Sequence, residues 1–363
     1  MPLENFEQTL AGKRVLLTGH TGFTGGWLAH WLTDLGCHVT GIGLAPETQP
    51  NLFEASAVAD IVDSHIVDIR EADKVAAIMN SAAPDIVFHL AAQPLVRRSY
   101  RDPLETFSTN VMGTAVVLEA ARHVASVRAF VCITTDKVYD NLEWAWPYRE
   151  TDTLGGKDPY SASKAAAELV TRAYQSTLTQ LSNSMKIATV RGGNIVGGGD
   201  WSEDRIIPDF YRALVNDETL SIRNPGAVRP WQHVLSACHG YMMVAAQLLD
   251  QNAADTEATQ NWSWNIGPTD NSTFTVRELI DHLATVWDRP NVDFNPSPLP
   301  EAQQLSLDVS KAKSVLGFNS PWDTEEVCRR VAEWYRDFAE NPETAHALSR
   351  AQIADYRAAI PKV

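Results

Sequence analysis

The chain has few cysteines, no long apolar run and no excess of basic residues. Its four cysteines lack the spacing of a metal site, so we expect reduced thiols and no bound metal: Cys37, Cys132, Cys238 and Cys328. No apolar segment is long enough to span a bilayer, and the first residues lack the basic and apolar regions of a signal peptide. The net charge of −15 argues against nucleic acid and membrane surfaces as partners. These absences predict a cytoplasmic protein.

A buried strand over residues 14–18 runs directly into a glycine-rich turn. Apolar residues then recur at three- and four-residue steps up to Gly36, which predicts a helix. Glycines allow a tight turn and a close approach of the backbone to a pyrophosphate, which then rests on the N-terminus of the helix. The turn therefore predicts a dinucleotide site formed by Gly19, His20, Thr21, Gly22, Phe23, Thr24 and Gly25.

The second expected strand, residues 38–44, bears on the identity of the dinucleotide. It ends without the Asp or Glu that binds an adenine ribose, and no Arg follows that would favour a 2′-phosphate. We predict NAD as the cofactor rather than NADP.

Strands and helices continue to alternate along the next hundred residues. Strands are expected over 61–69, 85–91 and 128–133, and helices over 71–81 and 114–122. The alternation predicts an α/β protein with a Rossmann-type, doubly wound parallel sheet. Two strand ends supply further candidate cofactor contacts: Asp68 and Ile69, and Leu90, Ala91 and Ala92. For Asp68, a surface ion pair with Arg70 is an equally good interpretation.

An acid–base pair is indicated by Tyr160 and Lys164, which lie four residues apart on a predicted helix. A nearby ammonium stabilises a phenolate, so we expect Lys164 to lower the pKa of Tyr160. The spacing also arises by chance, and the alternative is an exposed Tyr packed along a Lys stem. The strand 128–133 is followed by Thr135, Asp136 and Lys137. These residues should reach the same sheet edge as the candidate cofactor contacts at 90–92. Two candidate sites therefore converge.

These motifs resemble the extended short-chain dehydrogenase/reductase superfamily and, more closely, its nucleotide-sugar 4,6-dehydratases. The similarity covers nearly the whole chain and rests on the glycine motif, on His89-Leu-Ala-Ala, on Asn110 and on Tyr160-x-x-x-Lys164. Most sugar-nucleotide dehydratases have Thr-Asp-Glu where this chain has Thr-Asp-Lys, and Asp-Lys is similar to the CDP-glucose 4,6-dehydratases. The segments 191–201 and 229–234 agree with that closer resemblance.

The resemblance implies a lyase that makes a deoxysugar nucleotide, CDP-4-keto-6-deoxyglucose, from CDP-glucose. NAD would oxidise C4, water would leave across C5 and C6, and the hydride would return to C6. Tyr160 would take the C4 hydroxyl proton with Lys164 holding it ionised, Thr135 would bond the C4 oxygen, and Asp136 would protonate the departing C6 hydroxyl. Lys137 stands where a C5 base is usual, so it is either a neutral base or a charged group that stabilises the enolate.

The later part of the chain suggests a substrate site and a domain division, and the resemblance implies a homodimer. Asn194, Arg205, Arg229 and His233 are the candidate ligands of the nucleotide diphosphate, and for each Arg the alternative is a surface ion pair. Residues 1–194 and 233–266 would form the NAD-binding domain, and residues 195–232 and 267–363 a smaller, mixed α/β substrate lobe. Residues 251–260 are polar and predict an exposed loop. The dimer would form through helices around 106–122 and 161–180.

Two rival functions share these features. A nucleotide-sugar 4-epimerase uses the same Tyr–Lys pair and C4 oxidation but needs no elimination, so Asp136 and Lys137 disfavour it. A non-catalytic NAD-binding sensor on the same fold is disfavoured by the intact set of Thr135, Tyr160 and Lys164, because a sensor needs no phenolate base.

Overall fold

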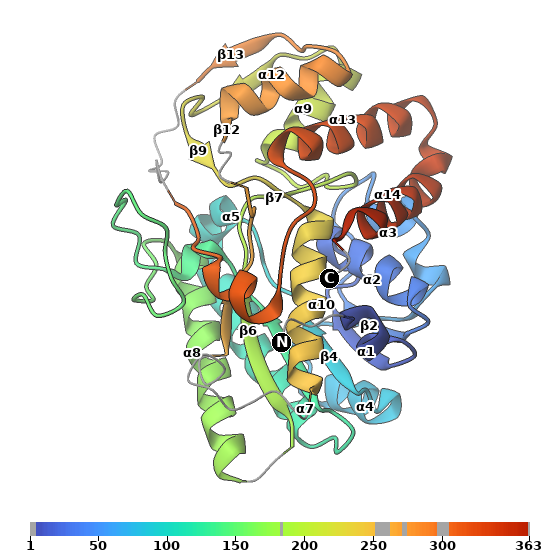
Figure 1. The fold of residues 1–363 in the computed structure, drawn as a ribbon, viewed down its shortest axis with the longest axis vertical. Helices are drawn as coiled ribbons and strands as arrows, with labels where there is room; N and C mark the ends of the chain where they lie inside the picture. Colours follow the sequence, from blue (N-terminus) through green and yellow to red (C-terminus); the bar gives the residue numbers. More distant parts are fainter. Residues whose placement is uncertain (1–4, 182–183, 251–261, 271–273, 296–304, 362–363) are drawn as a thin grey trace.

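The computed structural model describes residues 5–181, 184–250, 262–270, 274–295 and 305–361, and its centre is a seven-stranded parallel sheet (Figure 1). The strands lie in the order β11-β6-β5-β4-β1-β2-β3. Because β1 pairs in parallel with both β2 and β4, the strand order reverses beside β1. The predicted Rossmann-type, doubly wound fold is confirmed. The strands are β1 (Arg14–Thr18), β2 (His38–Gly43), β3 (Asp63–Ile66), β4 (Ile86–His89), β5 (Ala129–Ile133), β6 (Lys186–Arg191) and β11 (Ser263–Asn265).

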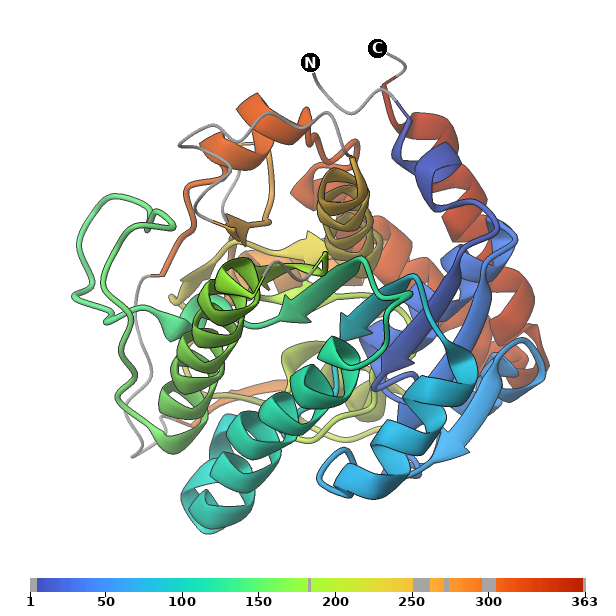
Figure 2. The ribbon, with the colours of Figure 1, turned by 90° about the horizontal axis from the view of Figure 1, so that it is seen from below.

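Helices cover both faces of this sheet (Figure 2). Successive side chains of a strand point to opposite faces, so Phe88 and Val131 belong to one core and Val87 and Phe130 to the other. Burial on both faces explains why β4 and β5 are almost entirely apolar. One face carries α1 (Phe6–Leu10), α2 (Phe23–Asp34) and α10 (Val234–Leu249), and the other carries α4 (Ala72–Ala82), α7 (Thr114–Arg122) and α8 (Pro159–Gln180).

The elements predicted from the sequence occur with small shifts of their ends. The strand expected over 61–69 is the shorter β3, and the segment 233–266 returns to the sheet as α10 and β11. The expected loop over 251–260 lies outside the described residues.

Beyond β6, the chain forms short two-stranded sheets with helices packed on them. Pairs form between β7 (Ile195–Val196) and β10 (Gln232–His233), between β9 (Val228–Arg229) and β12 (Phe274–Thr275), and between β8 (Leu220–Ile222) and β13 (Val292–Phe294). The accompanying helices are α9 (Ile206–Val215), α12 (Val276–Val286) and α13 (Thr324–Glu340). These elements lie above the carboxyl ends of the large sheet in Figure 1.

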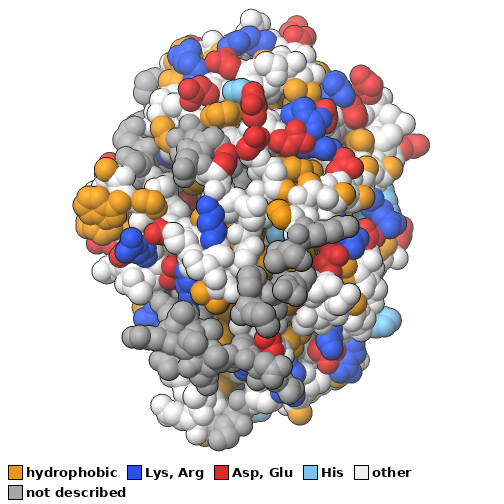
Figure 3. Space-filling view, viewed as in Figure 1, with side chains coloured by type: hydrophobic (Ala, Val, Ile, Leu, Met, Phe, Trp, Pro, Cys, Tyr) orange, Lys and Arg blue, Asp and Glu red, His pale blue; other side chains and the backbone are white. Residues whose placement is uncertain are grey.

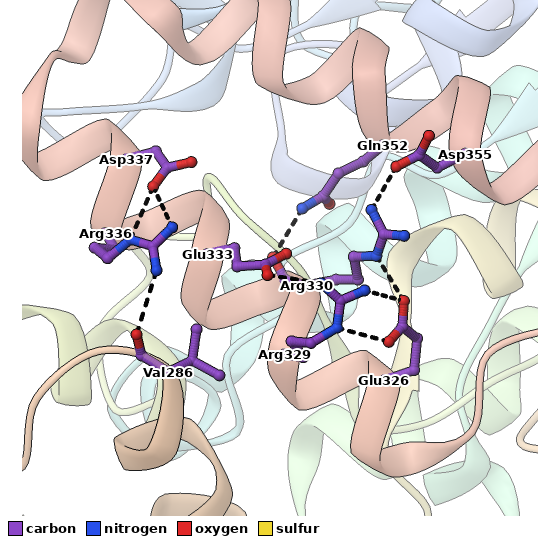
Figure 4. Close-up of polar contacts among 9 residues, drawn as sticks. All are labelled: Val286, Glu326, Arg329, Arg330, Glu333, Arg336, Asp337, Gln352 and Asp355. Carbon is purple, nitrogen blue, oxygen red and sulfur yellow. Dashed lines mark hydrogen bonds and ion pairs between the residues drawn. The ribbon is translucent and has the colours of Figure 1, made fainter.

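Helix α13 carries ion pairs at three- and four-residue spacing and connects two neighbouring helices (Figure 4). Arg330 reaches Asp355 of α14 (Ala345–Ala359) at 2.5 Å. At its other end, Arg336 donates to the carbonyl of Val286, which closes α12, at 3.3 Å. The pairs within α13 join Arg329 to Glu326 and Glu333, and Arg330 to Glu326.

Helix α14 packs against α2 and α3 (Leu52–Ala55), on the flank of the large sheet. Part of the segment 267–363 therefore lies beside the expected NAD-binding domain, and the predicted domain boundaries stay a prediction.

Acidic and basic side chains are interspersed over the upper helices in Figure 3. Among the described residues, no helix combines the length and apolarity needed to cross a membrane.

Candidate active site

A cavity of about 760 Å³ opens where the parallel strands β5 and β6 end. Open α/β sheets bind ligands at this edge, beside the point where the strand order reverses. Its wall combines residues that follow the sheet strands with residues of the segment 197–231. The predicted site residues in this wall are Thr24, Thr135, Asp136, Lys137, Tyr160, Asn194, Arg205 and Arg229.

Thr135, Asp136 and Lys137 leave β5 in a short 3₁₀ turn that fixes their side chains. The Thr135 hydroxyl donates to Asp136 Oδ1 at 2.9 Å and accepts the backbone N–H of Lys137 at 3.3 Å. Asp136 is buried and packs on Gly193, where an added Cβ would lie 2.2 Å from Asp136 Oδ2. Only a glycine at position 193 leaves room for this carboxylate.

Tyr160 lies in the first turn of α8, which Asp158 caps by accepting the N–H of Ser161 at 2.9 Å. Burial raises the pKa of Tyr160 to about 12, although a hydrogen bond with Thr135 and the Arg205 guanidinium both act to lower it. The expected lowering by Lys164 is absent from the charges that act on this phenol. Lys164 Nζ donates instead to the carbonyl of Ile133 at 3.0 Å. Its own pKa is lowered by burial.

A buried ion pair lies beneath this site. Glu168, one helical turn beyond Lys164, contacts Arg191 of β6 at 2.6 Å, and both side chains are almost fully buried. Hydroxyls of Thr134 and Thr189 also donate to the Glu168 carboxylate, at 2.6 and 3.0 Å. Although burial raises the pKa of Glu168, the bonds from Arg191 and the two threonines hold it below its usual value. The network joins α8 to β5 and β6 directly under Thr135.

The glycine-rich turn has the geometry of a dinucleotide cradle. Gly19 adopts φ +81°, and a Cβ there would lie 2.9 Å from the backbone nitrogen of Ala91. A Cβ on Gly25 would lie 2.0 Å from the carbonyl oxygen of Gly19, so the turn and α2 are in contact. Gly22 caps α2 without a side-chain hydrogen bond, which leaves the first N–H groups of the helix for a pyrophosphate. These residues fit the expected cofactor.

The other predicted cofactor residues differ in how they lie. Leu90, Ala91 and Ala92 are partly exposed just beyond β4. His20 turns inward, bonds Ser64 at 2.7 Å and is fully buried, which lowers its pKa to about 4. Ile69 is buried and packs on Gly113. Asp68 pairs with Arg70 at 2.5 Å, so the surface ion pair proposed as the alternative is present.

A family model described as GDP-mannose 4,6 dehydratase matches residues 16–331, from the first sheet strand into α13. The chain belongs to this family.

Its membership is supported by a relative of nearly equal length. The CDP-glucose 4,6-dehydratase of Salmonella typhimurium (strain LT2) is 44% identical over 362 residues, which cover 98% of each chain. Among solved structures, the dTDP-glucose 4,6-dehydratase DesIV from Streptomyces venezuelae with NAD bound gives a TM-score of 0.75 at 24% identity, over 91% of this chain and 99% of that one. A UDP-glucose-4-epimerase from Stenotrophomonas maltophila with bound NAD gives 0.78 at 22%, over 90% and 99%. The two structural likenesses show the fold.

The residues expected to hold the substrate do not all reach the cavity of this family member. Asn194 lines it with φ +50°, and its Nδ2 is buried without a hydrogen-bond partner among the described residues. Arg205 pairs with Asp200 at 3.3 Å, and Arg229 donates to the carbonyl of Val228 at 2.9 Å. Both guanidinium groups remain in the cavity wall.

His233 lies outside the cavity and corrects one expectation. Its ring is fully buried edge-on against Trp27 and Trp322, with centroids 5.8 and 4.9 Å away. Its Nδ1 accepts the N–H of Leu235 and so caps α10. The pairing of β10 with β7 turns the side chain into the core, and the structure does not bring it to the substrate residues.

The sequence alone missed several polar residues of the cavity wall. Arg97 of α5 (Val96–Arg101) and Arg223 both donate to Asp204 Oδ1, at 3.2 and 2.8 Å, across three distant segments of the chain. No local pattern identifies such a cluster. Glu168 did leave a signal, since it follows Lys164 by four residues and therefore lies on the same face of α8.

Proposed function

We propose that this protein is an NAD-dependent lyase that converts CDP-glucose to CDP-4-keto-6-deoxyglucose. The observation that carries the proposal is the meeting of Thr135, Asp136, Lys137 and Tyr160 in one cavity beside a dinucleotide cradle. An epimerase needs the hydroxyl and the phenol but has no use for a buried carboxylic acid at the reacting sugar. The similarity to the Salmonella typhimurium enzyme supports the choice of CDP-glucose.

Tyr160 is proposed as the base for C4 oxidation. NAD held by the glycine-rich turn would supply the hydride acceptor for C4 and the hydride donor for C6, and its oxidised form would bring a positive charge to the site. That positive charge would add to the charge of the Arg205 guanidinium in opposing the burial that raises the pKa of Tyr160. Tyr160 then accepts the proton of the C4 hydroxyl, while Thr135 donates a hydrogen bond to the oxygen as charge develops there.

Asp136 is proposed as the acid of the elimination. Its carboxyl is held against Gly193 and beside the Thr135 hydroxyl, and in its protonated form it would give a proton to the departing C6 hydroxyl. Lys137 acts at C5, either as a neutral amine that removes the proton or as an ammonium that stabilises the enolate. A Lys137→Met enzyme that still exchanges the C5 proton with solvent would eliminate the base.

The nucleotide diphosphate is proposed to bind along the part of the cavity wall that contains Asn194, Arg205 and Arg229. Arg205 and Arg229 offer guanidinium donors to phosphate oxygens, and Asn194 Nδ2, which has no hydrogen-bond partner among the described residues, offers a neutral one. His233 is left out of this site because it is enclosed by the core.

The test uses CDP-glucose deuterated at C4, with NAD, purified protein, and mass spectrometry and NMR of the product. Deuterium at C6 of a 4-keto-6-deoxy sugar is expected, since the hydride returns within one active site. Deuterium retained at C4 of an altered hexose would point to the epimerase. Tyr160→Phe serves as the matched control, because it keeps the ring and removes the proton acceptor. No turnover with CDP-, dTDP-, UDP- or GDP-glucose despite NAD binding would favour a sensor.

A homodimer is proposed through one side of the predicted NAD-binding domain. Large apolar side chains are exposed there on adjacent helices, which is unusual for a monomer surface. They are Leu104 and Phe107 of α6 (Pro103–Phe107), Met112 of the following π-helix η2 (Ser108–Gly113), and Leu169 of α8, with exposures of 83%, 38%, 58% and 54%. Burial of the four free cysteines agrees with a reducing, cytoplasmic location.

A further inference from the structure

His89, the last residue of β4, lies between two threonines and reaches neither the cavity nor the solvent. Its Nδ1 is 2.8 Å from the hydroxyl oxygen of Thr18, at the end of β1, and its Nε2 is 3.0 Å from the hydroxyl oxygen of Thr114, at the start of α7. Burial and the Lys164 charge lower the pKa of His89 to about 3, so the ring is neutral at pH 7. A neutral imidazole has one donor nitrogen and one acceptor nitrogen.

The neighbouring bonds decide which nitrogen carries the proton. The Thr114 hydroxyl has one proton and donates it in a hydrogen bond to the carbonyl of Asn110, at 2.6 Å. It must therefore accept the hydrogen bond that it shares with His89 Nε2. Nδ1 is then the acceptor, and Thr18 gives it the hydroxyl proton while accepting the backbone N–H of Ala91 at 3.1 Å. Every donor in this line has one acceptor.

The line connects the cofactor cradle to the catalytic helix. At one end, Thr18 holds Ala91, the residue that a Cβ on Gly19 would strike. At the other, Asn110 belongs to the π-helix η2, and its side-chain amide donates to Ser163 Oγ of α8 at 2.9 Å. Ser163 in turn donates to the backbone carbonyl of Tyr160 at 2.7 Å.

We propose that His89, fixed as the Nε2–H tautomer by Thr18 and Thr114, is a positioning residue that sets the Tyr160 end of α8 relative to the dinucleotide cradle. It touches neither substrate nor cofactor and acts through the backbone of Ala91 and through η2. The catalytic part of this inference rests on the proposed function, whereas the tautomer and the cofactor affinity do not.

The tautomer is tested on the protein without sugar nucleotide. Histidine labelled with ¹⁵N distinguishes Nε2–H from Nδ1–H by its two-bond ¹H–¹⁵N correlations, and loss of one set in His89→Gln assigns the residue. We expect the neutral Nε2–H pattern at pH 7. An Nδ1–H pattern or an imidazolium would overturn the proposal.

The positioning role is tested with Thr114→Val, which keeps the shape and removes the acceptor, and with Thr114→Ser, which restores it. Thr171→Val is the matched control, because that buried hydroxyl of α8 donates to the carbonyl of Ala167 in its own helix at 2.8 Å and takes no part in the line through His89. We expect Thr114→Val to weaken NAD binding and to lower kcat by roughly tenfold each, the effect of one lost buried hydrogen bond, with KM for CDP-glucose within about twofold.

The serine variant should return both quantities to near the wild-type values, and Thr114→Val should melt at the same temperature as Thr171→Val. A valine variant that matches Thr171→Val in NAD affinity, or a serine variant that fails to restore it, would overturn the proposal. If no sugar nucleotide is turned over, the proposed function fails, yet the NAD affinities and the tautomer still decide this one.

Discussion

We expect the substitution Glu168→Gln to destabilise the fold strongly, because it leaves the Arg191 guanidinium buried without a counter-charge. The two side chains are 1% and 0% exposed, so solvent cannot replace the lost partner. Removing one member of a buried pair costs about 3–5 kcal/mol. With an unfolding entropy near 2 cal/mol/K per residue, 363 residues give roughly 0.8 kcal/mol/K, so the melting temperature should fall by roughly 4–6 °C.

Differential scanning calorimetry measures this change. The double variant Glu168→Leu with Arg191→Met removes both charges, and we expect it to melt above Glu168→Gln. Lys74→Met breaks the exposed pair with Glu71 and should shift the melting temperature by less than about 1 °C, because solvent screens an exposed ion pair. A Glu168→Gln protein that melts at the same temperature as the Lys74→Met control would refute the reasoning. So would a double variant whose melting temperature falls by the sum of the falls caused by its two single substitutions.

Three further outcomes are expected. Gly193→Ala should displace the Asp136 carboxylate and lower kcat by about 100-fold with little change in melting, whereas wild-type turnover would contradict the contact. Leu104→Asp should shift the light-scattering mass from dimer to monomer, and an unchanged mass would move the interface elsewhere. Burial lowers the pKa of several histidines to about 3 or 4. Below pH 6.5 the unfolded chain therefore binds protons that the folded protein excludes, and the free energy of unfolding falls by up to about 1.4 kcal/mol per pH unit for each of these histidines. A urea midpoint at pH 5.5 equal to that at pH 7.5 would contradict this for His20, His30, His89, His233 and His239.

Local patterns predicted those parts of the fold that depend on neighbours in the chain. The apolar strands, the turn from Gly19 to Gly25 and the helix of Tyr160 follow from periodicity and glycine placement. The arrival of Thr135 and Tyr160 at one sheet edge also follows, because parallel strands end together.

Side-chain partners across the fold were beyond the same reasoning. Lys164 was expected to lower the pKa of Tyr160, but its ammonium donates a hydrogen bond to the carbonyl of Ile133. His233 was a candidate for the substrate site because the segment 229–234 resembles the CDP-glucose 4,6-dehydratases, yet the pairing of β10 turns it inward. Both outcomes depend on strands that are distant in sequence, and no local spacing encodes them.

The packing of α14 beside α1 and α2 bears on the order in which the protein can be made. Trp31 of α2 donates a hydrogen bond to the Glu7 carboxylate of α1, and Arg357 of α14 donates to the same carboxylate at 2.7 Å. The Tyr356 ring packs against the Trp31 ring, with centroids 5.6 Å apart. In Figure 2, the earliest and latest coloured helices lie side by side. During synthesis, the first helices emerge from the ribosome long before α14, so Tyr356 can pack on the indole of Trp31 only after almost the whole chain has been translated.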